Sequence, residues 1–303
     1  SDAAVIRLRK TNKALVMTTD CNGRYCYLNP RMGGRIAVAE AARNLVCSGA
    51  MPLAITNCLN FGNPYDPEVY WTFAECIEGM AEACRILETP VTGGNVSFYN
   101  EDPERIVYPT PVVGMIGLVE DIKYITTQWF KKEGDLIVLL GKNKEELGST
   151  EFLKVIHNLT KGEPPVLDLD YEKRVQQACL KLIKSEIVKS AHDCSEGGLA
   201  VALAECCVTS GNNLRLGAEI EIQNNLREDA LLFGETQSRI ILSLEEKDLP
   251  QFEKLIKEYD IDYAIIGKVG GENIKINNWI NLPVQKIKEK FYNSISEIME
   301  KRF

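Results

Sequence analysis

The sequence predicts a mixed α/β or α+β fold in two domains, and three observations lead to this prediction. Short apolar runs typical of strands alternate with longer stretches typical of helices. A polar segment, KKEGD at 131–135, separates two such series. The 303 residues, 45% of them hydrophobic, are enough for two domains with cores of their own. We therefore expect an N-terminal domain over residues 1–130 and a C-terminal α/β domain over residues 134–303.

The first predicted elements are a strand and a helix. The apolar run from Leu15 to Thr19 predicts a strand that delivers Asp20 to a loop. Gly33 and Gly34 are then expected to open an alanine-rich helix, which Gly49 ends. Small side chains let such a helix pack closely on a sheet, and a glycine-rich helix start can face an anion.

A second helix has clear start and stop signals. Asp66 is suited to the N-cap, Pro67 to the first helical position and Glu68 to the first turn. The helix is expected to run to about Glu88, before Pro90. Its apolar positions predict a buried face made of Phe73, Ile77, Met80 and Cys84.

The remaining elements follow the same alternation. A strand is predicted from Val112 to Glu120, and a new strand begins the second domain at Leu136. The later predictions are a helix from Asp168 to Ile187, an alanine-rich helix after Gly197 and Gly198, strands near Ile220, Ile240 and Ile265, and an amphipathic helix on the sheet within Pro283 to Phe303.

The charge and hydropathy of the chain exclude several functional classes. A net charge of -8 and no basic run argue against a nucleic-acid surface. No apolar stretch approaches the roughly 20 residues that cross a bilayer, and the first ten residues do not resemble a signal peptide. We therefore expect no membrane and no nucleic-acid partner, and a cytoplasmic location.

Ten cysteines raise the question of a metal or disulfide protein. They contain no C-x-x-C pair, and most lie in apolar or helical contexts, where a free cysteine acts as a small hydrophobic residue. Only His157 and His192 are available to complete a zinc site, and neither accompanies a nucleophile. We expect reduced, mostly buried cysteines, no zinc and no catalytic histidine.

The stretch TPVTGGNVSFYNE at 89–101 is the most informative motif. It places two glycines, expected to form a turn, after an apolar strand and follows them with Asn95, Ser97, Asn100 and Glu101. Glycines let a ligand approach the backbone closely, and amide, hydroxyl and carboxylate oxygens suit a hard cation or a sugar phosphate. The spacing matches neither a Walker loop nor a dinucleotide-binding fingerprint.

Together with four other stretches, this motif resembles a known family. The companions are TTDCNGRY at 18–25, GGRIAVAEAARNL at 33–45, ITNCLNFGNP at 55–64 and SAHDCSEGGLAVALAE at 190–205. Over nearly its whole length the chain resembles the second half of formylglycinamidine ribonucleotide amidotransferase (FGAM synthase), in its PurL-type form. The resemblance implies a PurM-like two-domain architecture. In that superfamily two similar halves form a pseudo-dimer around two nucleotide sites.

The resemblance implies an ATP- and Mg²⁺-dependent reaction of purine biosynthesis. Formylglycinamide ribonucleotide would be phosphorylated on its formyl oxygen, and ammonia from a separate glutaminase would displace the phosphate. Such chemistry depends mainly on alignment and charge control. The expected partners are the amino-terminal half of the same enzyme, the glutaminase and a small accessory subunit.

Four residues match positions through which this half contributes to the family's active site. The resemblance implies an ATP contact at Asn57, a nucleotide contact at Gly94, a magnesium ligand at Asn95 and a substrate contact at Ser97. Asn57 departs from the usual aspartate, and a neutral amide cannot supply the same charge. The alternative for Gly94, Asn95 and Ser97 is a turn with local side-chain capping.

A second group maps onto an auxiliary nucleotide site that holds ATP or ADP for structural reasons. The resemblance implies Asp20 and Asp193 as magnesium ligands, with Glu235 and Gln237 nearby. Asp193 has an alternative role as a cap of the helix that follows it. Asn44 stands where the active half of the family carries an aspartate, which implies fewer metals here.

The catalytic half is missing from this chain. Neither the family's catalytic histidine nor its ESHNHP-like metal motif occurs, so we expect no catalytic residue here. The chain also begins at Ser1 as if inside a domain. We expect a fragment that is inactive alone and that pairs with itself through the surface meant for the other half.

Three alternatives stay open. One is a different PurM-like synthetase acting as a homodimer, which Asn44 and Asn57 disfavour because an acidic metal motif is usual there. Another is a non-catalytic nucleotide-binding scaffold, which copurifying ADP would support. The most remote is a cysteine-rich redox or metal protein, which a metal assay would test.

Overall fold

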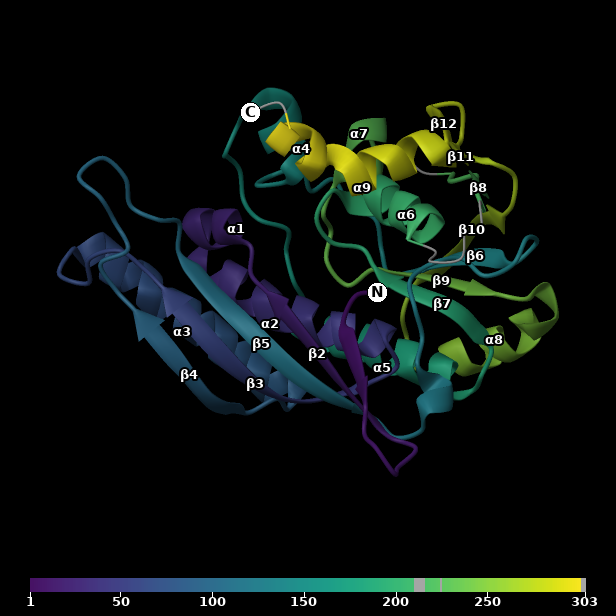
Figure 1. Cartoon of the computed structure of the whole chain (residues 1–303), viewed down its shortest axis with the longest axis horizontal. Coiled ribbons are helices and arrows are strands. Elements are labelled where there is room, and N and C mark those ends of the chain that lie inside the picture. Colours follow the sequence, from purple (N-terminus) through teal and green to yellow (C-terminus); the bar gives the residue numbers. More distant parts are fainter. Residues whose placement is uncertain (210–215, 224, 301–303) are drawn as a thin grey trace.

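A computed structural model describes residues 1–209, 216–223 and 225–300 and contains two sheets with helices packed on them (Figure 1). This confirms the mixed α/β prediction. We call the part around the first sheet the first domain and the part around the second sheet the second domain. The first sheet ends at Val119 and the second begins at Leu136, on either side of the predicted boundary segment, whose limits stay a prediction.

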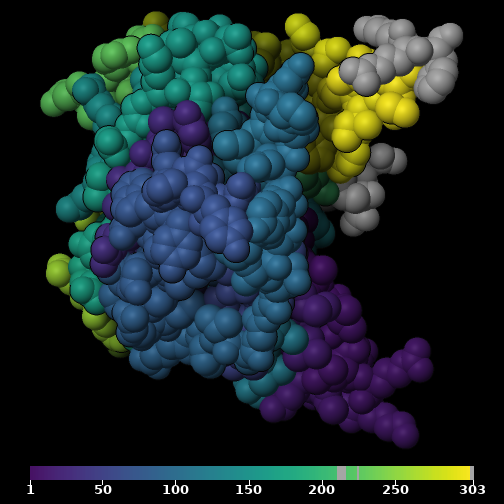
Figure 2. All heavy atoms as spheres, turned by 90° about the vertical axis from the view of Figure 1, so that its left-hand side faces the viewer, coloured from purple at the N-terminus to yellow at the C-terminus, as the bar shows by residue number. Residues whose placement is uncertain are grey.

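The first domain has five strands in the order β1-β2-β5-β3-β4. Its strands are β1 (Ala4–Arg7), β2 (Ala14–Asp20), β3 (Met51–Asn60), β4 (Val91–Ser97) and β5 (Thr110–Val119). Its helices are α1 (Gly23–Leu28), α2 (Pro30–Cys47) and α3 (Pro67–Leu87). The β3–β4 pair is parallel and the other pairs are antiparallel. Seen end-on, this domain lies in front of the second (Figure 2).

The second domain has seven strands in the order β12-β11-β8-β10-β6-β9-β7. Its strands are β6 (Leu136–Leu140), β7 (Val188–Asp193), β8 (Ala218–Ile220), β9 (Ile240–Leu244), β10 (Tyr263–Val269), β11 (Asn273–Ile276) and β12 (Ile280–Pro283). Its helices are α4 (Glu151–His157), α5 (Leu169–Lys184), α6 (Gly198–Val208), α7 (Glu228–Phe233), α8 (Leu249–Ile256) and α9 (Val284–Glu300), and short 3₁₀ turns lie at Ile122–Tyr124 and Glu246–Asp248. Strands β6 and β9 are buried along their whole length, as central strands covered on both faces are.

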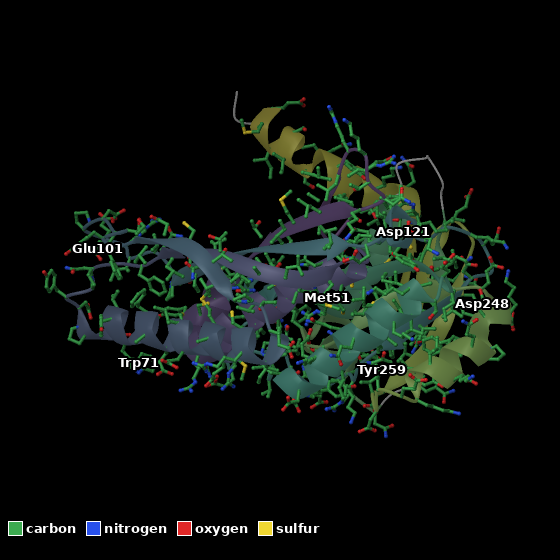
Figure 3. All side chains as sticks on the ribbon, turned by 90° about the horizontal axis from the view of Figure 1, so that it is seen from below. Met51, Trp71, Glu101, Asp121, Asp248 and Tyr259 are labelled. Carbon is green, nitrogen blue, oxygen red and sulfur yellow. The ribbon has the colours of Figure 1, made fainter. Side chains whose placement is uncertain are left out.

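The first sheet is covered by helices on one face only. Along β5, Val113, Met115, Gly117 and Val119 are buried towards the helices, while the residues that alternate with them are partly exposed. Figure 3 shows the helices of this domain gathered below the sheet. Among the described residues, the opposite face, which we call the open face, carries the apolar side chains Leu15, Met17, Val112, Ile116 and Leu118.

Helix α2 begins earlier than predicted. Asn29 caps it by accepting a hydrogen bond from the Met32 backbone amide, and Pro30 occupies its first position. The prediction that Gly33 and Gly34 open the helix is therefore wrong, because both lie inside it. Gly49, with φ +87°, follows its end as expected.

The glycines of α2 and α3 serve close helix packing. A Cβ added at Gly34 would lie 2.4 Å from the carbonyl oxygen of Cys76, and one at Gly79 would lie 2.0 Å from that of Arg31. Such distances are far inside van der Waals contact, so only glycine lets the two helices approach this closely.

Helix α3 follows its sequence signals closely. Asp66 caps it, Pro67 begins it, and Glu88 ends it in the left-handed conformation at φ 59°. Met80 and Cys84 are buried as predicted, and Phe73 packs against the core from a partly buried position. The prediction for Ile77 is wrong, since it is 36% exposed; Cys76 and Ala83 lie on the buried face instead.

Two further predictions need correction. Gly93 and Gly94 lie within strand β4 and not in a turn after it. Helix α9 contacts β12 of the sheet, as predicted, and also α6, but its burial is smaller than expected: among its described residues Val284 is buried and Ile287 packs partly buried against the core. Phe291, Ile295 and Ile298 are exposed, and residues 301–303 of the predicted helix lie outside the described residues.

Within residues 1–209, 216–223 and 225–300, no helix combines the length and apolar character needed to cross a membrane.

We predict that Gly79→Ala destabilises the first domain by about 1–3 kcal/mol, because the new methyl group meets the Arg31 carbonyl and must push α2 away. Urea unfolding followed by circular dichroism measures this loss. Gly93→Ala is the control, since a Cβ there meets no atom within 4 Å. Equal stability of the two variants would contradict the close-packing explanation.

Candidate functional site

The four residues predicted at the active site lie on the edge of the first sheet. In the parallel β3–β4 pair, Asn57 is opposite Gly94, Cys58 is opposite Asn95, and Asn60 is opposite Ser97. Side chains alternate between the two sides of a sheet along each strand. Asn57 and Gly94 therefore lie on the side covered by the helices, whereas Asn95 and Ser97 lie on the open face. We call Asn57, Gly94, Asn95 and Ser97 the edge group. Strand β4 is an edge strand, so a ligand can reach both faces around it.

Close packing and hydrogen bonds hold the edge group in place. A Cβ at Gly94 would lie 2.0 Å from Asn57 Oδ1, so glycine is needed beside that amide. Ser97 Oγ donates to Asn100 Oδ1 at 3.1 Å, and Asn100 Nδ2 donates to the Ser97 carbonyl at 2.7 Å. Asn95 is exposed, and its amide lies 3.9 Å from Cys58 Sγ. The arrangement therefore orients Ser97 and leaves Asn95 accessible.

Asn100 and Glu101, which the sequence suggested as ligand contacts, form hydrogen bonds within the protein instead. Besides its contact with Ser97, Asn100 donates to the Phe61 carbonyl at 3.0 Å. Glu101 accepts from the Asn63 backbone amide at 2.8 Å and braces the loop before α3. Beside this loop, a cleft of about 700 Å³ opens between the start of α3 and residues 104–109, and its walls include Tyr27, Trp71 and Tyr108.

The four residues predicted at the auxiliary site gather at the seam between the domains. Asp20 ends β2, Asp193 ends β7, and Glu235 and Gln237 precede β9. Three buried charged residues, Glu40, Arg43 and Glu172, and the exposed Glu196 join them. We call the whole set the interdomain cluster; it comprises Asp20, Glu40, Arg43, Glu172, Asp193, Glu196, Glu235 and Gln237.

Arg43 of α2 connects the cluster. Its side chain is fully buried, and Nε donates to Asp193 Oδ2 at 2.9 Å. Nη1 donates to Glu172 Oε2 at 2.9 Å, and Nη2 donates to Gln237 Oε1 at 3.0 Å. Burial opposes its charge, but Glu172 and Asp193 together raise the pKa of Arg43. One guanidinium thus binds the first domain to three elements of the second.

The other carboxyls of the cluster crowd one another. Burial, then the charges of Asp193 and Glu196, raise the pKa of Asp20, which also accepts a hydrogen bond from Asn44 Nδ2 at 3.1 Å. Burial and Asp20 raise the pKa of Glu40, while burial and Glu235 raise the pKa of Glu196 to about 7. The seam therefore contains more acidic groups than Arg43 alone neutralises.

Glu235 links three helices through its hydrogen bonds. Its carboxylate accepts from the backbone amides of Gly197 at 2.7 Å and Glu151 at 2.9 Å, and from the hydroxyl of Tyr25. Burial raises the pKa of Glu235. These bonds connect the starts of α4 and α6 to α1. Gln237 adds a further hydrogen bond, since its Nε2 donates to the Glu235 carbonyl at 3.1 Å.

Asp193 does not cap the following helix. The N-cap of α6 is Gly197, at φ 81°, and no side chain caps it. Asp193 Oδ1 instead accepts from Ser195 Oγ at 2.8 Å, and Oδ2 accepts from Arg43. The capping alternative is therefore wrong, and both oxygens of this carboxylate are engaged.

Oxygen donors for magnesium fit better at Asp20 than at Asp193. Only Oδ2 of Asp20 accepts a hydrogen bond from the described residues, and carboxylate and amide oxygens are ligands that Mg²⁺ prefers. In the described part of the chain, no three histidine, cysteine or acidic side chains are placed to hold one ion. All ten cysteines are free, and eight are buried, in agreement with their prediction as packing residues.

The sequence reasoning missed Glu40, Arg43, Glu172 and Tyr25. One signal was available: Glu40 and Arg43 are charged residues three positions apart in the part of α2, residues 36–43, whose other residues are small or apolar. Such a pair, buried on one helix face, requires partners from elsewhere in the fold.

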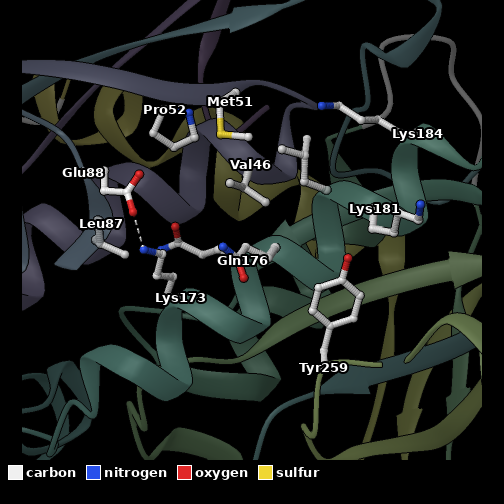
Figure 4. Close-up of a pocket in the computed structure, with 12 residues that line it drawn as sticks. Val46, Met51, Pro52, Leu87, Glu88, Lys173, Gln176, Lys181, Lys184 and Tyr259 are labelled. Atoms are coloured by element: carbon white, nitrogen blue, oxygen red, sulfur yellow. Dashed lines mark hydrogen bonds and ion pairs between the residues drawn. The ribbon is translucent and has the colours of Figure 1, made fainter. Parts of the chain in front are cut away.

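A pocket of about 400 Å³ lies between the two domains, apart from both the edge group and the interdomain cluster (Figure 4). It lies between the ends of α2 and α3 and the side of α5. Lys173 there pairs with Glu88 at 2.8 Å, and Val46, Leu180 and Pro52 supply an apolar floor. None of the predicted site residues lines it, so it is not the candidate site.

Two family models match the chain. The model of AIR synthase related protein, N-terminal domain, matches residues 1–119, and the model of AIR synthase related protein, C-terminal domain, matches residues 132–277. The chain belongs to the AIR synthase related family. The first sheet falls within the first matched region, and the second sheet, except for β12 (Ile280–Pro283), falls within the second. Each matched region thus contains most or all of one sheet.

Members of this family with curated names are similar over most of the chain. Phosphoribosylformylglycinamidine synthase subunit PurL of Moorella thermoacetica is 49% identical over 302 residues, which are 98% of this chain and 41% of that protein. The subunit of the same name from Alkaliphilus metalliredigens is 50% identical over 276 residues, 91% of this chain and 37% of that one. These matches confirm the PurL-type resemblance, and the chain spans about two fifths of these relatives' length.

Solved structures share the fold at low identity. "T. maritima PurL complexed with FGAR" aligns with a TM-score of 0.77 at 20% identity, over 94% of this chain and 47% of that one. A chain from "Crystal structure of HypE-HypF complex" aligns with a TM-score of 0.65 at 18% identity, over 93% of this chain and 92% of that one. The fold thus occurs both as part of a longer chain and as nearly a whole one.

We predict a pH-dependent stabilisation from His192, which lies 8% exposed beside the cluster. Its Nδ1 is 2.7 Å from Asp2 Oδ1 and its Nε2 is 3.0 Å from Glu205 Oε2; burial opposes its charge, but these carboxylates raise its pKa well above 6.5. A raised folded-state pKa stabilises the fold below the unfolded pKa and loses this effect as pH rises through the folded value. His192→Gln should therefore lower the unfolding midpoint most at about pH 6, less as the pH rises.

Thermal unfolding between about pH 6 and 9 tests this prediction, with His157→Gln, an exposed position at the end of α4, as the control for loss of an imidazole. A difference in unfolding midpoint between wild type and His192→Gln that grows as the pH rises would contradict the prediction.

Proposed function

We propose that the chain is the second half of an FGAM synthase. In this enzyme ATP phosphorylates the formyl oxygen of formylglycinamide ribonucleotide, and ammonia then displaces phosphate to give the amidine. Support comes from the relative that is 49% identical and carries the name of this synthase, and from the part of its length that the chain spans. Ammonia would come from a separate glutaminase, with a small accessory subunit in the complex.

The observation that carries the proposal is the position of the edge group. Gly94, Asn95 and Ser97 lie on the edge strand β4, and Asn57 lies on the neighbouring strand β3, beside the apolar open face. An uncovered apolar sheet face marks a surface for another protein element. We propose that the amino-terminal half of the same enzyme covers the open face and completes the active site at the edge group.

Each edge residue then has a role in binding or orientation. Asn57 and Gly94 would contact ATP, with the bare glycine backbone allowing close approach. Asn95 would supply an amide oxygen to Mg²⁺, and Ser97, oriented by Asn100, would contact the ribonucleotide substrate. When bound, magnesium would neutralise the phosphates. Asn57 would contribute hydrogen bonds without charge, unlike the aspartate usual in the family.

We further propose that a nucleotide, ATP or ADP, binds at the interdomain cluster as an auxiliary ligand. Asp20 is the better candidate for a magnesium ligand there, because one of its oxygens lacks a bond from the described residues. Asp193, also predicted as a ligand, would take part only by giving up a present hydrogen bond. Glu235 and Gln237 would shape the wall of this site.

An alternative is a nucleotide-binding scaffold or a homodimeric synthetase of the same fold. The match to 92% of a chain in the HypE–HypF structure favours it, because there a fold of this size forms nearly a whole chain. In this case two open faces would pair with each other.

We predict that the chain alone forms no ADP from ATP, formylglycinamide ribonucleotide, Mg²⁺ and ammonium chloride, and that it does so once mixed with the preceding part of the Moorella thermoacetica relative. Each part supplies only some of the site, so turnover requires both. A coupled ADP assay measures this, with each part alone as the control. Turnover by the chain alone would favour the homodimer and contradict the half-enzyme proposal.

We predict that Ser97→Ala in this mixture raises the KM for the ribonucleotide about tenfold, as expected for one lost hydrogen bond to a bound ligand. The KM for ATP should change little. Ser294→Ala, on exposed α9, is the control. An unchanged KM for the ribonucleotide would remove Ser97 from the binding site.

A further inference from the structure

We propose that Arg43 is the built-in cation of the interdomain cluster and occupies the place that a metal ion would take at Asp193. Its guanidinium lies 2.9 Å from Asp193, 2.9 Å from Glu172 and 3.0 Å from Gln237. Glu40 lies within 3.8 Å of the same group. Four polar side chains therefore converge on one positive charge.

Burial makes this charge necessary. Arg43 and Glu172 side chains are 0% exposed and Asp193 is 2% exposed, so water does not solvate them. A buried carboxylate is costly unless a cation and hydrogen bonds compensate it. Arg43 supplies both, since its planar fork donates to three acceptors at once.

A metal ion does not fit beside Asp193 while Arg43 is in place. Oδ2 of Asp193 accepts from Arg43 and Oδ1 accepts from Ser195. A guanidinium has no lone pair with which to coordinate an ion, and its positive charge repels one. In the described residues, no other acidic, histidine or cysteine side chains assemble into a metal-binding group around it.

The position of Arg43 gives this cation a structural task. It extends from α2 of the first domain to β7, α5 and the segment before β9 of the second. The two domains are thus held together by a charge that cannot dissociate, and the seam forms without added metal. Arg43 does this whether or not the chain is half of a synthase, so the two proposals fail independently.

The test is thermal unfolding of the purified chain without nucleotide, in excess EDTA and in excess MgCl₂. We expect the wild-type midpoint to differ by less than about 2 °C between the two buffers. We expect Arg43→Met to lower it by about 10 °C, because the buried carboxylates lose their partner. Arg31→Met on the same helix, whose ion pair with Glu82 is exposed, is the matched control and should change it by about 2 °C or less.

Charge neutralisation separates loss of charge balance from loss of packing. Adding Glu172→Gln and Asp193→Asn to Arg43→Met should recover at least half of the lost midpoint, or restore folding if Arg43→Met does not fold. A wild-type loss of more than about 2 °C in EDTA, an Arg43→Met effect no larger than that of Arg31→Met, or a triple variant that recovers nothing would each overturn the proposal.

Discussion

A sheet with only one covered face is the constraint on which the rest of this structure depends. Helices α2 and α3 bury one side of the first sheet, and the other carries a continuous set of partly exposed apolar side chains. Burying apolar surface is the main driving force of folding and association, so this face requires a partner. The edge group lies at the border of this face, on β4 and on the neighbouring β3. The same association that covers the sheet would therefore also complete the site.

The second constraint is electrostatic and acts between the domains. The seam concentrates acidic groups whose charges are unfavourable there, as the raised pKa values of Asp20, Glu40 and Glu196 show. Arg43 offsets part of this charge, and Glu235 fixes two helix starts by accepting their backbone amides. The relative placement of the domains thus depends on a few buried polar contacts between residues far apart in the chain.

The sequence predicted the elements whose signals are local. Asp66 and Pro67 start α3 through contacts within its first turn, and the continuous apolar run at Leu136 forms the buried strand β6. The glycine motif was expected to form a turn after a strand, whereas Gly94, Asn95 and Ser97 lie within β4 beside Asn57 of β3. What the sequence could not give was the geometry that distant segments impose.

Three errors show this limit. Gly34 resembles a helix start in sequence, but its role comes from the backbone at Cys76. The apolar stripe of α9 predicts burial along the helix, yet Val284 is buried, Ile287 is only partly buried, and Phe291, Ile295 and Ile298 are exposed. Arg43 finds partners 129, 150 and 194 positions away, so no local spacing reveals it. Each error concerns a contact between residues that only the fold brings together.

The two groups differ in a way that suits different tasks. A catalytic site must release its products, and the edge group is accessible to solvent. Its side chains, two amides and a hydroxyl, are neutral, so any charge at this site would come from the bound ligands. A site that maintains shape needs a cation that stays, and Arg43 is covalently part of the chain and fully buried. Exchange of ligands at the interdomain cluster would require breaking salt bridges that join the domains. This asymmetry favours chemistry at the open edge and a structural role at the seam.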